Sequence, residues 1–207
     1  MRETPPASEQ GHMLDASALP SFAFGHRSLM WWSTLCLIAI ESTVFALAVA
    51  SYFYLRSHAP RWPLSTPAPD LLWGSLNTGI LLASTLPNHW LKQAGEAGNL
   101  PRMRLWFVVC LVFSLAFLGV RALEFTTLNV RWDTDAYGSI VWMLLALHTV
   151  HLITDTWDTG VLAVLMFTGP LEGQRRVDTS ENAQYWYFVV LSWLPIYTVL
   201  YWAPRVS

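Results

Sequence analysis

Charged residues are scarce in this sequence. Only 13% of its 207 residues are Asp, Glu, Lys or Arg, whereas 54% are hydrophobic, and the mean hydropathy is +0.37. Soluble domains carry about 25% charged residues, so this composition excludes an ordinary soluble globule and indicates a membrane protein. The formal net charge is only -2, and no cluster of Lys and Arg is long enough to predict nucleic-acid binding.

Cysteine is also scarce, and the N-terminal residues lack the apolar stretch that a signal peptide would need. Cys36 and Cys110 lie far apart inside apolar segments, in no CxxC or CxxxC pattern. A disulfide, a thiolate metal site and covalent haem attachment therefore lack support. Residues 1–28 contain several Pro and Ser and lack the apolar core of a cleavable signal peptide. We expect them to form a flexible tail, and the first membrane segment to be retained as an anchor.

Long apolar segments are what the sequence does contain. A helix crosses roughly 30 Å of hydrocarbon with about 20 residues. Short connections rich in Pro, Gly and Asp make consecutive helices antiparallel neighbours, and Pro87 and Asn88 are expected to end the second segment early. The sequence thus predicts an all-α integral membrane bundle over residues 29–207, with five transmembrane helices at about 29–55, 71–90, 105–128, 140–167 and 185–202.

The basic residues predict the orientation of the bundle. Those in the tail, the second connection and the fourth connection outnumber those on the opposite side, so the positive-inside rule places the N-terminus in the cytoplasm. The residues counted are Arg2, Arg27, Lys92, Arg102, Arg104, Arg175 and Arg176 on one side, and Arg56, Arg61, Arg131 and Arg205 on the other.

The fourth segment carries four ionisable side chains on one helical stripe. The spacing of His148, His151, Asp155 and Asp158 tracks the 3.6-residue turn. Charged groups near the bilayer centre cost roughly 2.5–3.5 kcal/mol each on insertion scales, so the stripe should face other helices or a partner protein.

Two further segments carry intramembrane carboxyl groups. Glu41 has no basic residue near it in its own segment, so we expect it to be protonated or hydrogen-bonded to another helix. It could handle protons, sense lipid headgroups or simply join two helices. Arg121 and Glu124 are three residues apart and are expected to form a structural ion pair. Glu124 is also, like Glu41, a candidate for a buried carboxyl group linked to protons or lipid. Asn77 and Thr78 are expected to bond to neighbouring helices.

A metal site is the alternative for the stripe. With Glu41 and Glu124, its His and Asp residues have the types found in a carboxylate-bridged di-iron centre. Such bundles usually repeat a Glu-x-x-His pair, and none of the five predicted membrane segments contains one. We therefore predict no catalytic residue, no metal and no cofactor bound by this chain, and keep an independent membrane di-iron enzyme as the competing hypothesis.

The order of these motifs resembles subunit III of the heme-copper terminal oxidases, in its five-helix bacterial form. Ile40-Glu41-Ser-Thr-Val-Phe with the following Tyr-Phe-Tyr-Leu-Arg56 is similar to the family's helix with a buried Glu. Leu76-Asn77-Thr78, His148-x-x-His151 and Tyr185-Trp186-Tyr-Phe-Val resemble three later family motifs. The resemblance covers nearly everything from the first segment onward.

The resemblance implies an accessory subunit of the bacterial cytoplasmic (inner) membrane. Haem and copper would belong to the catalytic partner, with subunits I and II as neighbours, while cytochrome c or quinol is oxidised and oxygen is reduced to water. This chain would hold structural phospholipid, support proton uptake and stabilise the catalytic subunit. The resemblance also implies that Glu41 is the family's buried carboxyl group and that His148 and His151 are the family's histidines on a helix.

Four positions depart from the family pattern. Where the family tends to have Gln, Gly, His and Asp, this chain has Arg121, Asp155, Tyr187 and Val190. The added acidity of Asp155 and Asp158 suggests a different partner or an oxidase with another electron donor. An accessory subunit of a nitric-oxide reductase, which belongs to the same superfamily, and an assembly or scaffolding protein remain alternatives.

Overall fold

The computed structural model describes residues 22–64 and 67–206. The part of the expected N-terminal tail before residue 22 lies outside the described residues. Within the rest of that tail, a short helix η2 (Gly25–Arg27) precedes Ser28, whose side chain accepts a hydrogen bond from the Met30 amide at 3.2 Å. The membrane bundle therefore begins with a capped helix at Leu29.

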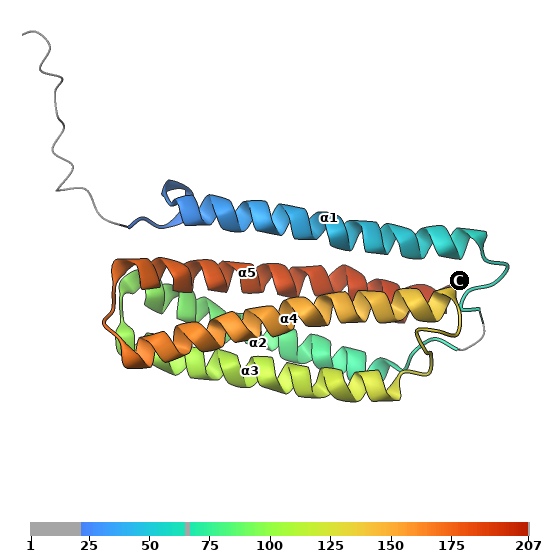
Figure 1. The fold of residues 1–207 in the computed structure, drawn as a ribbon. Coiled ribbons are helices and arrows are strands. Elements are labelled where there is room, and N and C mark those ends of the chain that lie inside the picture. The colour runs from blue at the N-terminus through green and yellow to red at the C-terminus, as the bar shows by residue number, and fades with distance from the viewer. Residues whose placement is uncertain (1–21, 65–66, 207) are drawn as a thin grey trace, which may run out of the picture.

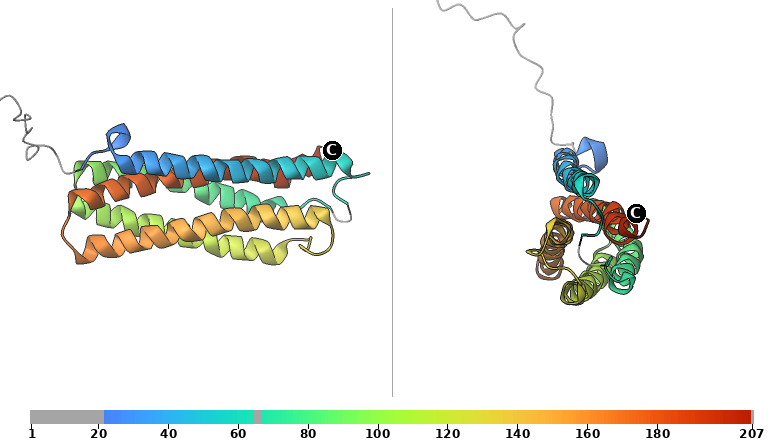
Figure 2. Two further views of the ribbon diagram at one scale, coloured as in Figure 1. Left: turned by 45° about the horizontal axis from the view of Figure 1, so that its top comes forward. Right: turned by 90° about the vertical axis from the view of Figure 1, so that its right-hand side faces the viewer.

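Five long helices form the described fold, as the all-α prediction requires (Figure 1). Four of them, α2 to α5, surround a common axis, and α1 lies outside this group against α5 and α4 (Figure 2). Their bounds are α1 Leu29–His58, α2 Leu71–Ala97, α3 Leu100–Thr127, α4 Ala136–Thr168 and α5 Gly173–Tyr197, the last continued by a π-helical turn η3 (Thr198–Trp202) and by η4 (Ala203–Arg205).

Short polar side chains cap the N-termini of three helices, close to where the apolar segments begin. Asp70, Asn99 and Asp135 accept hydrogen bonds from backbone amides in the first turns of α2, α3 and α4. Each satisfies an amide that has no partner within its helix. Between α2 and α3, Gly98 adopts a left-handed conformation with φ 68°, which glycine reaches without a steric penalty.

The prediction that α2 ends near Trp90 is wrong. The helix continues through Pro87 to Ala97. Proline removes one backbone hydrogen bond, but neighbouring helices can compensate for that loss in a packed bundle. Here Asn88, the residue after Pro87, donates from Nδ2 to the Ala183 carbonyl of α5 at 2.8 Å and joins the two helices.

The last helix also begins earlier than the apolar segment. The sequence predicts a segment from about residue 185, yet α5 starts at Gly173. Its polar first half is buried against other helices; Asn182, for example, donates to Thr159 of α4 at 2.9 Å. A hydropathy pattern detects the apolar, lipid-exposed part of a helix. It therefore did not detect the first half of α5, whose polar side chains bond to other residues inside the protein.

Four described helices are long and apolar enough to cross a membrane: α1, α3, α4 and the stretch from Gly173 to Arg205 that contains α5. This agrees with a membrane bundle. α2 does not reach the same hydropathy, so the expected count of five spans stays a prediction.

The main core lies between α2, α3, α4 and α5. Phe117, Val141, Leu144, Val189 and Trp193 are fully or almost fully inaccessible there. By contrast, α1 buries only Phe45, Ala48 and Tyr52. The outermost helix is thus attached along one narrow edge, and this loose packing creates the spaces described next.

Candidate functional site

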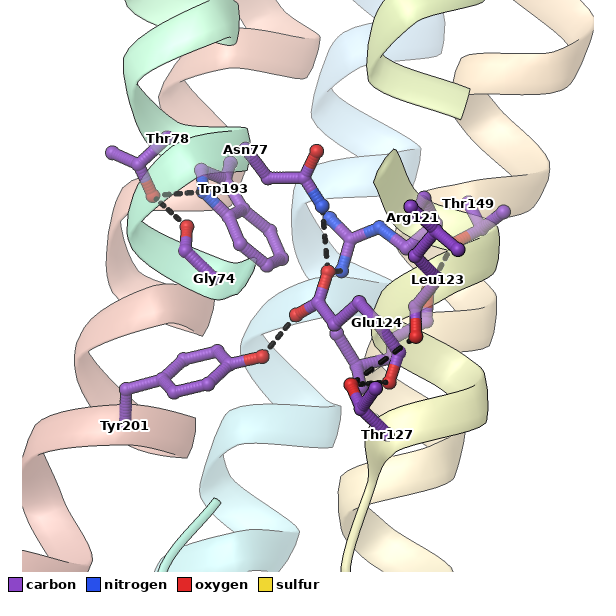
Figure 3. A network of polar contacts seen from close by, with 11 residues as sticks. Gly74, Asn77, Thr78, Arg121, Leu123, Glu124, Thr127, Thr149, Trp193 and Tyr201 are labelled. Atoms are coloured by element: carbon purple, nitrogen blue, oxygen red, sulfur yellow. Dashed lines mark hydrogen bonds and ion pairs between the residues drawn. The ribbon is translucent and has the colours of Figure 1, made fainter. Parts of the chain in front are cut away.

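The carboxyl group of Glu124 is enclosed by the four-helix group (Figure 3). Glu124 is 2% exposed, and its Oε2 lies 2.9 Å from Arg121 Nη1 on the same helix. Asn77 of α2 donates from Nδ2 to the same oxygen at 2.6 Å, and the Tyr201 hydroxyl of η3 donates to Oε1. Hydrogen bonds to an ionised group are about twice as strong as neutral ones. We call these four residues the Glu124 network.

Aromatic rings line the cationic side of this network. The Arg121 guanidinium carbon lies 4.2 Å from the Trp193 ring centroid and 5.0 Å from that of Phe117. The faces of aromatic rings attract a cation, and the attraction is stronger when the cation is buried away from water. The Trp193 Nε1 group in turn donates to Thr78 Oγ1 at 2.8 Å. Asn77 and Thr78 both meet residues of other helices, and the arrangement suits a structural role.

Glu41 meets two partners from different helices. The Tyr185 hydroxyl of α5 donates to Glu41 Oε2 at 2.7 Å, and His151 Nε2 of α4 lies 3.5 Å from Oε1. His151 Nδ1 lies 2.7 Å from the Leu147 carbonyl, which only accepts, so Nδ1 carries a hydrogen. A single proton between Nε2 and the carboxyl group then decides whether the pair is neutral or ionic.

The stripe on α4 divides between two surroundings. His148 is inaccessible to solvent and lies in the bundle core, where its Nε2 is 3.0 Å from the Val189 carbonyl. His151 and Asp155 lie on the side facing α1 and α5, and Asp158 is exposed there. Three of the four residues are thus buried or half-buried, and Asp158 is exposed at the groove described next.

A groove of about 720 Å³ lies between α1, α4 and α5. We call it the acidic groove, because five carboxyl groups line it and no Lys or Arg of the described residues does. They are Glu41, Asp155, Asp158, Asp178 and Glu181. Asp155 is 3% exposed, and neither of its side-chain oxygens has a hydrogen-bond partner among the described residues. Burial of a carboxyl group without a hydrogen-bond partner is energetically costly, which makes Asp155 the least satisfied carboxyl group of the groove.

The described residues contain no group of three or more His, Cys, Asp or Glu side chains placed to hold a metal ion. His148 points to Val189 of α5, whereas His151 points to Glu41 of α1. The two histidines do not converge on one point, so the geometry gives the di-iron hypothesis no support.

The remaining two departures from the family pattern lie on α5. Tyr187 places its hydroxyl 3.3 Å from His89 Nδ1 of α2, whereas Val190 is 4% exposed within the main core. Both fill space between α5 and its neighbours, and neither lines the acidic groove.

Sequence reasoning missed several members of these sites. Tyr185 and Tyr201 were not recognised as partners of Glu41 and Glu124. Asp178 and Glu181 lie before the predicted fifth segment and were assigned to no site. A signal for the last two was available, because residues 178, 181 and 185 follow helical spacing. No comparable signal identified the tyrosine partners, which come from distant parts of the chain.

These features define a helical membrane protein whose polar side chains mainly join helices to one another. Comparison with known proteins makes this specific: the family model described as cytochrome c oxidase subunit III matches residues 20–204. The chain belongs to the cytochrome c oxidase subunit III family.

Its relatives among curated proteins are distant but align over most of their length. The chain is 26% identical over 168 residues to cytochrome c oxidase subunit 3 of Thermostichus vulcanus, covering 81% of this chain and 84% of that protein. It is 23% identical over 184 residues to that of Synechocystis, covering 86% and 77%. A probable cytochrome c oxidase subunit 3 of Mycobacterium tuberculosis is 26% identical over 178 residues, covering 81% and 85%.

Proposed function

We propose that this chain is accessory subunit III of a respiratory heme-copper terminal oxidase and carries no redox centre of its own. The observation that carries the proposal is the family match, which runs from residue 20 to residue 204 and includes all five helices. Haem and copper would lie in the catalytic subunit I, with subunit II completing the assembly. Oxidation of cytochrome c or quinol and reduction of oxygen to water would occur on those partners.

The proposed topology has five spanning helices in a bacterial inner membrane, with the N-terminus in the cytoplasm. α2 is not among the helices apolar enough to cross a membrane by composition alone, but it packs along α3 and α5. Its Asn77 and Asn88 are 0% and 3% exposed, so its polar groups face protein instead of lipid. Under this proposal residues 1–28 form a cytoplasmic tail and residues 29–207 the membrane domain.

The polar residues have separate roles in this proposal. Arg121 and Glu124 fix the register of α3 against α2 and the end of α5. Glu41 and its partner His151 handle a proton or respond to lipid, because a single proton sets the charge of the pair. Asp155 and Asp158 provide a contact surface beside α1.

Structural phospholipid is proposed to bind on both sides of α1. The acidic groove lies on one side, and an apolar hollow of about 580 Å³ between α1 and α5, lined by Phe45, Val49 and Leu191 among others, lies on the other. Both spaces flank the helix that is least buried in the bundle. Occupation by lipid would fill them and support proton uptake and stability of the catalytic subunit.

Gentle purification of the tagged chain from its native membrane tests the proposal. We expect a large catalytic subunit to co-purify, together with its haem and copper absorption, and expect these signals to leave when this chain is stripped away. The matched control is the same membrane expressing the untagged chain.

Two results would contradict the proposal. A lone protein with stoichiometric iron would instead support a membrane di-iron enzyme. Loss of the oxidase in a deletion strain, with no copy of this chain in the mature oxidase, would instead identify an assembly protein.

A further inference from the structure

Acceptor atoms without a partner gather along the acidic groove. Asp155 is 3% exposed, and neither of its carboxyl oxygens has a hydrogen-bond partner among the described residues. Oε2 of Glu181 and Oδ1 of Asn182 are also buried without a partner, and both residues line the groove. Carbonyl and ionised carboxyl oxygens only accept hydrogen bonds. An occupant that satisfies this wall of the groove must therefore supply several donors.

The carboxyl groups follow one another in a row and do not surround one point. Asp155 and Asp158 are three residues apart on α4, and Glu41 contacts His151 one turn away on the same helix. At 1.5 Å per residue, the row from His151 to Asp158 is about 10 Å long. Asp158 repels the charges of both Asp155 and Asp178. No three ligating side chains converge in the described residues, so the row suits several separate positive charges better than one metal ion.

Basic side chains act on the row only from outside the groove. Lys92 of α2 attracts Glu181 but does not line the groove, and Arg27 borders an adjoining hollow that it shares with Asp178. No Lys or Arg of the described residues lines the groove beside Asp155 or Asp158. The charges of these two aspartates are therefore the ones that an occupant would balance.

The groove also has an apolar side. Met30 and Leu37 of α1 line it opposite the carboxyl groups, and Leu162 of α4 lines it beyond Asp158. Apolar surface is stabilised when hydrocarbon covers it. The occupant should therefore carry hydrocarbon between its positive charges.

We propose that the acidic groove binds a linear polyamine, a chain of ammonium groups joined by short methylene segments. One ammonium group would lie between Asp158 and Asp178, and a second would donate to Asp155, while the methylene segments contact Met30 and Leu37. Each ammonium group carries up to three N–H donors, which suits a wall of acceptors. The inference goes beyond the proposed function, which places lipid along α1 and names no ligand for the carboxyl groups of α4 and α5.

Titration of the purified full chain with spermidine tests the proposal. Isothermal titration calorimetry in an uncharged detergent, at fixed pH and ionic strength, gives the dissociation constant. We expect saturable binding of spermidine, binding about tenfold weaker for butylamine, which has a single ammonium group, and no displacement by an equal concentration of Mg²⁺. Asp155→Asn and Asp158→Asn should each weaken spermidine binding about tenfold, because each removes a charge-assisted hydrogen bond.

Glu172→Gln is the matched control. It removes one carboxyl group at the start of α5, where Glu172 is exposed and its side chain caps no amide, so spermidine affinity should not change. Asp158→Glu keeps the charge and should keep most of the affinity. Circular dichroism and gel filtration identify any variant that fails to fold. If Asp155→Asn fails, Asp178→Asn at a half-buried position replaces it, with the same expected loss.

The proposal is overturned if spermidine does not bind, or if the folded Asn variants bind it as tightly as the wild-type chain. An equal loss in Glu172→Gln would also overturn it, since the effect would then come from overall charge. Equal binding of butylamine, or displacement by Mg²⁺, would show that a row of separate charges is not what the groove recognises. The titration uses the isolated chain, so its outcome is independent of whether a catalytic subunit co-purifies.

Discussion

Glu124 and Asp155 are buried to nearly the same degree, at 2% and 3% exposure, yet their surroundings differ. Glu124 receives hydrogen bonds from two other elements and pairs with Arg121, whereas Asp155 has no hydrogen-bond partner in the described chain. The first lies among helices packed on several sides, and the second lies beside α1, which buries only three side chains. Burial alone therefore does not distinguish these two carboxyl groups; they differ in the number of donors that the surrounding helices supply.

Replacing Arg121 with Leu should give the largest effect. It would leave Glu124 buried without its cation, and breaking a buried pair in this way costs about 3–5 kcal/mol of unfolding free energy. Thermal unfolding in detergent measures the loss. The double variant Arg121→Gln with Glu124→Gln should recover most of it, because both charges are gone. Arg131→Gln, which breaks an exposed ion pair with Asp133, is the control and should leave stability unchanged.

Tyr201→Phe should have the next largest effect. It removes one donor from the buried Glu124 carboxylate while keeping the ring, and a hydrogen bond to a charged group contributes about 1.5–3 kcal/mol. The same unfolding assay checks it. Tyr197→Phe is the control, since the hydroxyl of Tyr197 bonds to Ser75 at an exposed position. Equal losses in both variants would mean that the Glu124 network does not stabilise the bundle in this way.

Gly74→Ala should disturb the same network indirectly. An added Cβ would lie 2.5 Å from the Tyr201 ring, so the ring or the helix must shift. Overpacking of this kind costs typically about 1–3 kcal/mol. Gly79→Ala, on the same helix with open space around its Cβ, should instead be neutral or raise stability by up to about 1 kcal/mol. A similar loss at both positions would indicate a helix effect instead of contact with Tyr201.

Changes at Glu41 should have the smallest effect on stability. Tyr185→Phe removes one donor from a partly exposed carboxyl group, so we expect about 0.5–1.5 kcal/mol by the unfolding assay. Tyr54→Phe, at an exposed position of α1, is the control. In the assembled oxidase, Glu41→Ala should leave haem content intact but change lipid retention or working lifetime. If both stay at their wild-type values, Glu41 does not have the proposed role.

Much of the fold could be predicted from local patterns. Hydropathy located the helices, and Asp70, Asn99 and Asp135 stand where capping side chains are needed. Local patterns failed where a neighbouring helix compensates for an unfavourable residue. Pro87 does not end α2, which packs against α5 through Asn88 at this point, and the polar start of α5 is helical although its hydropathy is low.

For the candidate site, the sequence predicted which polar residues share a face of the same helix. The spacing of Arg121 and Glu124, and that of the four residues on α4, follows from the pitch of a single helix. The acidic groove could not be predicted from the sequence, because its walls come from three helices and its volume depends on how loosely α1 packs.

The sequence by itself determined the all-α membrane class, the family and which residues carry charge, because composition, motif order and helical period are local properties. Only the tertiary structure decided which polar groups meet. Tyr185 and Glu41 are 144 residues apart, and Asn77 and Glu124 are 47 apart. Such contacts depend on the rotation and the neighbours of each helix, which are set when the whole bundle packs and each buried polar group finds a partner.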